Sequence, residues 1–151
     1  GDRRVKPDDD VLSGNGYTEE MTVLIFDDHS RLELVRTGDP APGYPASSYR
    51  TRIGVSSGPF SVTVEAFAQN YVVFLRALSR LSGSMEGEAK LEFWNEEHAI
   101  VLKGSGDGTI ELDARITDGR SPWSACLRIS MALDQSFLPG VISALNEEFP
   151  V

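Results

Sequence analysis

The stretch LRISMALDQSFLPGVISAL, residues 127–145, decides the fold. Apolar and polar residues alternate up to Asp134, which is the period of a strand, and the apolar residues after Gln135 follow helical spacing. The carboxylate of Asp134 can accept hydrogen bonds from the first free amides of that helix, so we expect it to be the N-cap. Pro139 has no amide hydrogen and is tolerated only near a helix start. We therefore interpret this segment as a structural corner between a strand and a helix.

A second joint of this kind lies upstream, in VTVEAFAQNYVVFLRAL, residues 62–78. Both joints place a glutamine, then an aromatic residue two positions on, then aliphatic residues. Alternating segments bounded by Gly, Pro, Asn, Asp and Ser predict four strands before each joint. The predicted strands are residues 21–26, 31–37, 49–56, 60–65, 88–94, 98–103, 108–117 and 122–133, and the predicted helices are about 66–81 and 135–149. An internal duplication would explain this order, and so would hydrophobic periodicity alone.

Short connections between strands favour antiparallel neighbours. We therefore predict an α+β fold, with a mainly antiparallel sheet of about eight strands and two helices packed on one face. A chain of 151 residues fits one domain, which we place at residues 21–151 after a loose arm at residues 1–20. The helical residues expected to face inward are Phe67, Tyr71, Phe74, Leu75, Leu78, Leu81, Phe137, Val141, Ile142, Leu145 and Phe149.

Composition excludes several classes of function. The formal net charge is -9, with 14 Lys and Arg against 23 Asp and Glu, and no basic stripe typical of nucleic-acid binders is visible. No apolar run is long enough to span a membrane. Cys126 is the only cysteine, which rules out an intrachain disulfide and suits the reducing cytoplasm. The acidity either keeps the protein in solution or attracts a basic partner.

The second half of the predicted sheet offers the best candidate surface. Alternation sends the apolar residues of strands 88–94 and 108–117 inward, and it sends their charged residues and one tryptophan outward. An aromatic residue ringed by charges is typical of a protein-binding patch. The alternative is an ordinary solvated face on which carboxylates pair with Lys90 and Arg115. The predicted partner-binding residues are Glu88, Glu92, Trp94, Glu111 and Asp113.

Residues suited to catalysis are few and scattered. FDDHS, residues 26–30, is typical of a hairpin turn around His29, and we expect His98 to be a solvated strand end. Cys126 has no histidine near it in the sequence, and GSGDG, residues 104–108, connects two strands instead of opening a helix around a phosphate. We therefore expect no enzyme activity, no metal and no cofactor. A small hydrolase would require two of His29, His98 and Cys126 to meet in a pocket.

A carrier of small apolar ligands is the remaining alternative. Such a protein would hold its ligand in a cavity between sheet and helix. The cavity would be lined by residues such as Phe60, Val62, Phe67 and Phe74.

Four motifs resemble the WapI-type immunity family of bacterial polymorphic-toxin systems. An apolar helix contains FLRAL at residues 74–78, and GEAKL at 87–91 opens a strand. GTIEL at 108–112 follows a glycine-containing turn, and DQSFLP at 134–139 forms the corner before the last helix. The similarity covers about residues 67–147.

This resemblance implies a small cytoplasmic protein that binds a cognate toxin and neutralises it without catalysis. It transfers no defined binding residue, because the shared motifs are structural. Ser136 and Phe137 stand where the family pattern leads us to expect Thr and Tyr. The resemblance and the charged sheet face together predict a protein partner with a basic surface.

Overall fold

The computed structural model describes residues 22–38, 48–95, 97–119 and 125–150 of the chain. The predicted arm at residues 1–20 lies outside these ranges. The described residues form eight strands and two α-helices in the predicted order. The elements are β1 Val23–Phe26, β2 Ser30–Arg36, β3 Tyr49–Ser57, β4 Phe60–Ala68, α1 Tyr71–Ser84, β5 Glu86–Glu92, β6 Ala99–Ser105, β7 Thr109–Asp118, β8 Ala125–Asp134 and α2 Leu138–Glu148.

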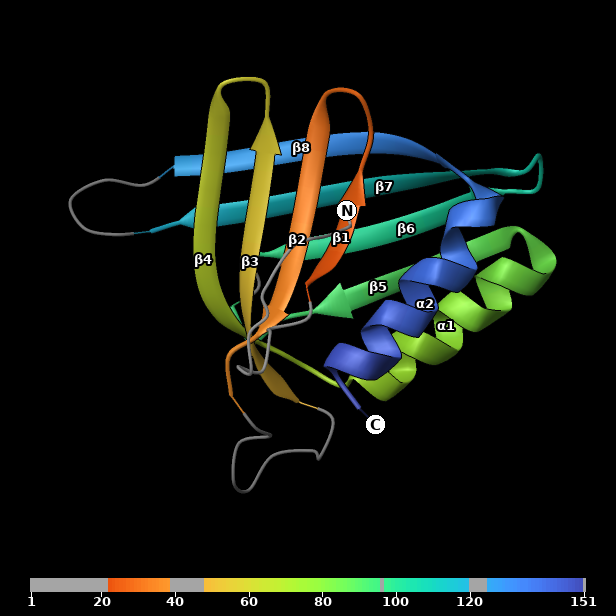
Figure 1. Ribbon diagram of the computed structural model, residues 1–151, viewed down its shortest axis with the longest axis horizontal. Coiled ribbons are helices and arrows are strands. Elements are labelled where there is room, and N and C mark those ends of the chain that lie inside the picture. The colour runs from red at the N-terminus through yellow and green to blue at the C-terminus, as the bar shows by residue number, and fades with distance from the viewer. Residues whose placement is uncertain (1–21, 39–47, 96, 120–124, 151) are drawn as a thin grey trace, which may run out of the picture.

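The strands form two four-stranded antiparallel sheets, β1-β2-β3-β4 and β5-β6-β7-β8. The two sheets face one another with their strands crossing (Figure 1). The α+β class and the antiparallel pairing are confirmed, but the strands divide between two sheets where the sequence predicted one. The division falls at α1, because a helix between β4 and β5 prevents these strands from continuing as a hairpin.

One corner still joins the two sheets. Ala68 and Phe93 form an isolated bridge between the ends of β4 and β5. The Gln69 amide donates to the carbonyl oxygen of Glu92 at 2.7 Å, and the Trp94 amide donates to the carbonyl oxygen of Phe67 at 3.1 Å. This corner fixes the position of the second sheet relative to the first.

The core fills the space between the two sheets and the helices. Alternate residues of each strand point into it, as the period of two predicted. Leu32 and Ile53 from the first sheet and Leu91 and Leu112 from the second are completely buried, with 0% exposure. The inward residues predicted for β5 and β7 are all buried: Ala89, Leu91, Phe93, Ile110, Leu112, Ala114 and Ile116.

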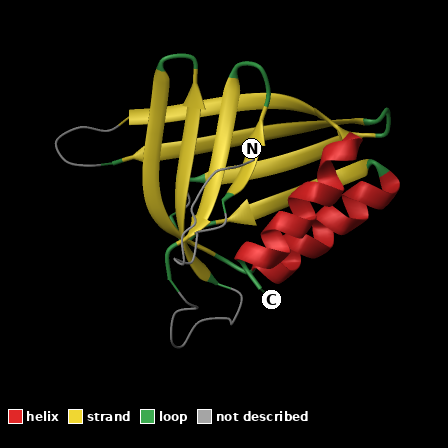
Figure 2. Ribbon diagram, in the orientation of Figure 1, coloured by secondary structure: helices red, strands yellow, loops and turns green. Residues whose placement is uncertain are grey.

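The helices lie side by side next to the first sheet, and α1 packs against β5 (Figure 2). The helices and the first sheet cover the same side of the second sheet (Figure 1). The other side of β5–β8 is covered by neither of them. Most predicted inward helical residues are buried, but two predictions were wrong. Phe67 belongs to β4, and Phe137 is 46% exposed. Neither described helix is long and apolar enough to cross a membrane.

The corner at Asp134 has the predicted cap. Asp134 is extended, and its carboxylate accepts a hydrogen bond from the Ser136 amide at 2.9 Å. This bond lowers the pKa of Asp134. Residues Gln135–Phe137 form one turn of 3-10 helix before α2. The upstream joint differs, because Asn70 enters the left-handed region at φ 48° and Tyr71, the counterpart of Phe137, is fully buried.

Candidate functional site

The outward side chains of the second sheet form regular rows across its strands. Strand pairing sets these rows, because directly opposite residues on one face lie next to each other. The first row contains Glu88, Lys103, Glu111 and Ala132. The second row contains Lys90, Val101, Asp113 and Ser130. The third row contains Glu92, Ala99, Arg115 and Arg128.

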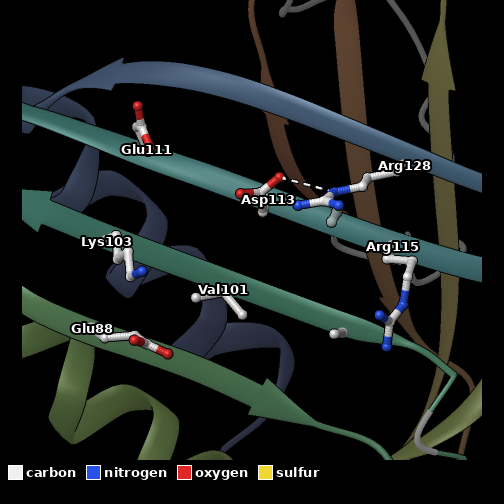
Figure 3. Close-up of a pocket in the computed structure, with 9 residues that line it drawn as sticks. Glu88, Val101, Lys103, Glu111, Asp113, Arg115 and Arg128 are labelled. Atoms are coloured by element: carbon white, nitrogen blue, oxygen red, sulfur yellow. Dashed lines mark ion pairs between the residues drawn. The ribbon is translucent and has the colours of Figure 1, made fainter.

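A shallow hollow of about 310 Å³ occupies the middle of this face. Its floor is β6, where Ala99 and Val101 have short side chains and are half-buried. Longer charged side chains from the neighbouring strands, and Lys103 from β6 itself, form the walls (Figure 3). They are three carboxylates and three cations: Glu88, Glu111, Asp113, Lys103, Arg115 and Arg128. The sequence pattern predicted a surface dominated by carboxylates, whereas the structure shows mixed charge. We call this depression the central hollow.

The charges of the central hollow are only partly paired. Asp113 accepts a hydrogen bond from the Ser130 hydroxyl at 2.7 Å and lies 3.5 Å from the Nε of Arg128. That ion pair is exposed and contributes about 0–1 kcal/mol. Among the described residues Glu88, Lys103 and Glu111 form no ion pair, although they are neighbours in one row. Figure 3 shows their side chains pointing in different directions. These charged groups are therefore available to a partner.

Three of the five predicted binding residues meet in this hollow: Glu88, Glu111 and Asp113. Glu92 lies two rows from Glu111 and lines other depressions. Trp94 follows the end of β5, is 40% exposed and packs on Phe67 with 5.9 Å between ring centres. The predicted patch thus divides into the central hollow and the corner between the sheets.

Lys103 and Arg128 are the side chains that the prediction missed. Both lie on strands whose outward residues follow the same alternation as those of β5 and β7. Applying the period of two to β6 and β8 would have identified them.

A second depression, of about 350 Å³, lies where β4, β5, β6 and β7 meet. It shares Ala99 and Arg115 with the central hollow, so the two depressions are adjacent. Its lining residues are Gln69, Lys90, Glu92, Phe93, His98, Ala99 and Arg115. We call it the corner hollow.

His98 is the most deeply placed ionisable group of the corner hollow. It is 5% exposed, so the expectation of a solvated strand end was wrong. Its Nδ1 accepts a hydrogen bond from the Thr117 amide at 3.2 Å, and its ring meets Phe93 edge-on at 5.9 Å. Burial lowers the pKa of His98, which favours the neutral ring. Ile100 points inward, and residues two apart in a strand share a face. The same alternation would therefore have placed His98 inward.

The burial of His98 predicts a dependence of stability on pH. Its pKa is lowered in the folded state, so the unfolded chain binds the proton first, near its ordinary pKa of about 6.5. The free energy of unfolding should therefore fall between about pH 7 and 5, above the range where carboxylates titrate. We expect His98→Gln, which retains an acceptor for Thr117, to flatten this slope in urea titrations. His29→Gln, at an exposed position, is the control and should retain it; equal slopes in all three proteins would contradict the assignment.

The structure does not gather the residues of the hydrolase alternative in one depression. His29 lies in the β1–β2 turn, where the Asp27 carboxylate accepts the amides of His29 and Ser30 at 2.8 and 2.7 Å. These two hydrogen bonds lower the pKa of Asp27. Cys126 is exposed on the outer face of β8, where its partner on β7 is Thr117. His98 is instead buried, and it contacts Thr117 through the backbone amide of that residue. Within the described ranges no group of His, Cys, Asp and Glu side chains could hold a metal ion.

The residues proposed for an apolar-ligand cavity are also far apart. Phe60 is the first residue of β4 and is 67% exposed, whereas Phe74 is buried in α1. Phe67 lies seven residues along β4 from Phe60, a distance of roughly 23 Å in a strand. These side chains do not converge on one cavity.

Comparison of the chain with known protein families, characterised proteins and solved structures gave no match. The similarity to WapI-type immunity proteins therefore depends on the sequence motifs alone.

Proposed function

We propose that the protein is a non-catalytic binding protein that docks a basic protein partner on the outer face of β5–β8. The resemblance to immunity proteins suggests that this partner is a toxin, neutralised in the cytoplasm. Neutralisation needs only a complementary surface that blocks the toxin, so no catalytic group has to be present in the site. The observation that carries the proposal is the central hollow, with three of the predicted carboxylates around a floor of short side chains.

Charge distribution supports a basic partner. The net charge of -9 attracts positively charged partners. This attraction acts over several ångströms, because dissolved salt screens charges at longer distances. At contact, Glu88 and Glu111 offer carboxylates that have no ion pair within the described part of the chain. Asp113 can exchange its exposed pair with Arg128 for a cation of the partner. We call Glu88, Glu111 and Asp113, with Lys103 between the first two, the acidic end of the face. Attraction of this kind mainly increases the association rate.

Charge reversal tests the proposal directly. The tagged protein is used to capture partners from a lysate of its source, and the captured protein is identified and tested for toxicity with and without the binding protein. We expect Glu111→Lys with Asp113→Lys to lower the association rate by roughly tenfold at low salt. Suppression of toxicity should weaken with it.

The matched control carries the same change of charge on other surfaces, Asp28→Lys with Glu147→Lys. Both control residues are exposed and lie outside the two hollows of the sheet face. The control should retain capture at close to the normal rate. Undiminished association of the Glu111 and Asp113 variant at low salt would refute docking at the acidic end.

A further inference from the structure

β8 is an edge strand of the second sheet, with β7 as its only neighbour among the described strands. The Thr117 amide of β7 points toward β6, where it bonds to His98. Hydrogen-bonding direction alternates along an antiparallel strand, so Cys126, which lies opposite Thr117, turns its backbone groups away from β7. Every second residue from 126 to 132 shares this direction. These residues form what we call the free edge of β8.

The free edge of β8 is open to pairing with another strand. Within the described chain no turn or loop backbone bonds to residues 126–132. The strand is ten residues long, and it contains neither proline nor glycine. An edge of this kind presents a row of unpaired amides and carbonyl oxygens, which is a template for an added strand.

The first sheet projects past the free edge. The β1–β2 and β3–β4 turns extend beyond β8, and β4 crosses β8 near its first residues (Figure 1). Phe60 begins β4 and shares its inner side with Val62 and Val64, which pack against the core. Phe60 is nevertheless 67% exposed. Leu127, on the inner side of β8, is only partly buried as well. Apolar side chains thus lie exposed on the side of the sheet that is otherwise covered.

We propose that the free edge of β8 binds an extended segment of a protein partner by strand addition. The backbone of the segment pairs with residues 126–132. Its apolar side chains, at alternate positions, pack beneath Phe60 and against Leu127. Its polar side chains lie on the outer face, beside Arg128 and Ser130. This interaction goes beyond docking on the outer face, and it can be tested without the partner.

The projecting turns favour a single segment over a second copy of the chain. One added strand lies about 4.8 Å from β8, beneath the turns of the first sheet. Two copies joined through their β8 edges would share one continuous sheet, with both first sheets on the same side of it. Each copy would then bring its projecting turns into the space that the turns of the other occupy.

The test uses a short neutral peptide with blocked ends, in which valine alternates with threonine, lysine and glutamate. Opposite residues of a sheet share a face, so the polar residues of the peptide pair with Arg128 and Ser130. The control peptide is methylated on the backbone nitrogens of these polar residues. Nuclear magnetic resonance should show saturable shifts of the Arg128 and Ser130 amides and of the Phe60 ring. Hydrogen exchange of the two amides should slow, and the control peptide should cause neither change.

Side-chain variants test the apolar contact. Phe60→Ser should weaken binding of the peptide by roughly tenfold, because the segment loses the apolar surface that covers it. Phe60 is largely exposed, so the fold should be retained. Phe26→Ser is the matched control, since Phe26 is 51% exposed but lies on the outer side of the first sheet. It should leave the affinity unchanged.

A backbone variant tests the pairing independently. Ser130→Pro removes an amide that points away from β7, a position at which edge strands tolerate proline. It should abolish binding of the peptide. Ser130→Ala also loses the hydroxyl that bonds to Asp113, but it keeps the amide and should bind normally.

Two results would overturn the inference. Absence of saturable shifts, or equal binding of the methylated peptide, would exclude strand addition. A concentration-dependent dimer that Ser130→Pro abolishes would assign the free edge to a second copy of the chain. Neither result alters capture of a basic partner at the acidic end, so the two proposals fail separately.

Discussion

Phe149→Ala is expected to lower the free energy of unfolding by about 3–5 kcal/mol. Phe149 is completely buried at the end of α2, where its ring stacks on Tyr71 at 4.2 Å and lies 5.7 Å from Tyr49. Truncation would leave a cavity between α2, α1 and the first sheet. The loss would be a large share of the 5–15 kcal/mol typical of a small domain. Urea unfolding followed by circular dichroism measures it.

The other aromatic residue of this segment provides the control. Phe137→Ala removes the same atoms from a side chain that is 46% exposed, so its cost should stay below about 1.5 kcal/mol. Hydrogen bonds near Phe149 remain in both variants: Tyr49 donates to the carbonyl oxygen of Pro150 at 2.6 Å, and Glu148 accepts the Arg36 amide at 2.7 Å. Equal losses in the two variants would show that α2 contributes little through this contact.

The comparison of Phe137 with Phe149 shows how far helical spacing predicts burial. Both residues fit one apolar stripe in the sequence, and the stripe correctly placed Val141 and Leu145 in the core. Phe137 departs from it because the 3-10 turn after Asp134 has a different periodicity from the α-helix. Local patterns therefore predicted the elements, whereas the exact geometry of a joint depended on its cap and its neighbours.

The candidate site was predictable in part for a related reason. Strand alternation identified the carboxylates of the acidic end, because the side to which a residue points is a local property. The hollow itself depends on which strands are neighbours, and pairing between distant segments is not encoded in any one of them. Ala99 and Val101 become a floor only because β5 and β7 place longer side chains on either side. His98 meets Phe93 across the β5–β6 hairpin and accepts the amide of Thr117 from β7, so its surroundings also depend on which strands are neighbours.

Gly104→Ala is the second substitution with a large expected effect. A Cβ at Gly104 would lie 2.5 Å from the carbonyl oxygen of Met85 and 2.7 Å from the Cδ1 of Leu81. The Met85 carbonyl is fixed by a hydrogen bond from the Gly106 amide at 2.7 Å, so the backbone cannot move away without losing it. We expect a loss of about 1–3 kcal/mol or more in urea unfolding.

The same substitution at Gly83 should have the opposite sign. Gly83 lies in the last turn of α1, and a Cβ there would meet nothing within 4 Å. Alanine has the higher helix propensity, so Gly83→Ala should stabilise the protein by roughly 0.5–1 kcal/mol. If Gly104→Ala were neutral while Gly83→Ala stabilised, β6 would not pack closely against the end of α1. The floor of the central hollow would then lack its support, because β6 carries both Ala99 and Val101.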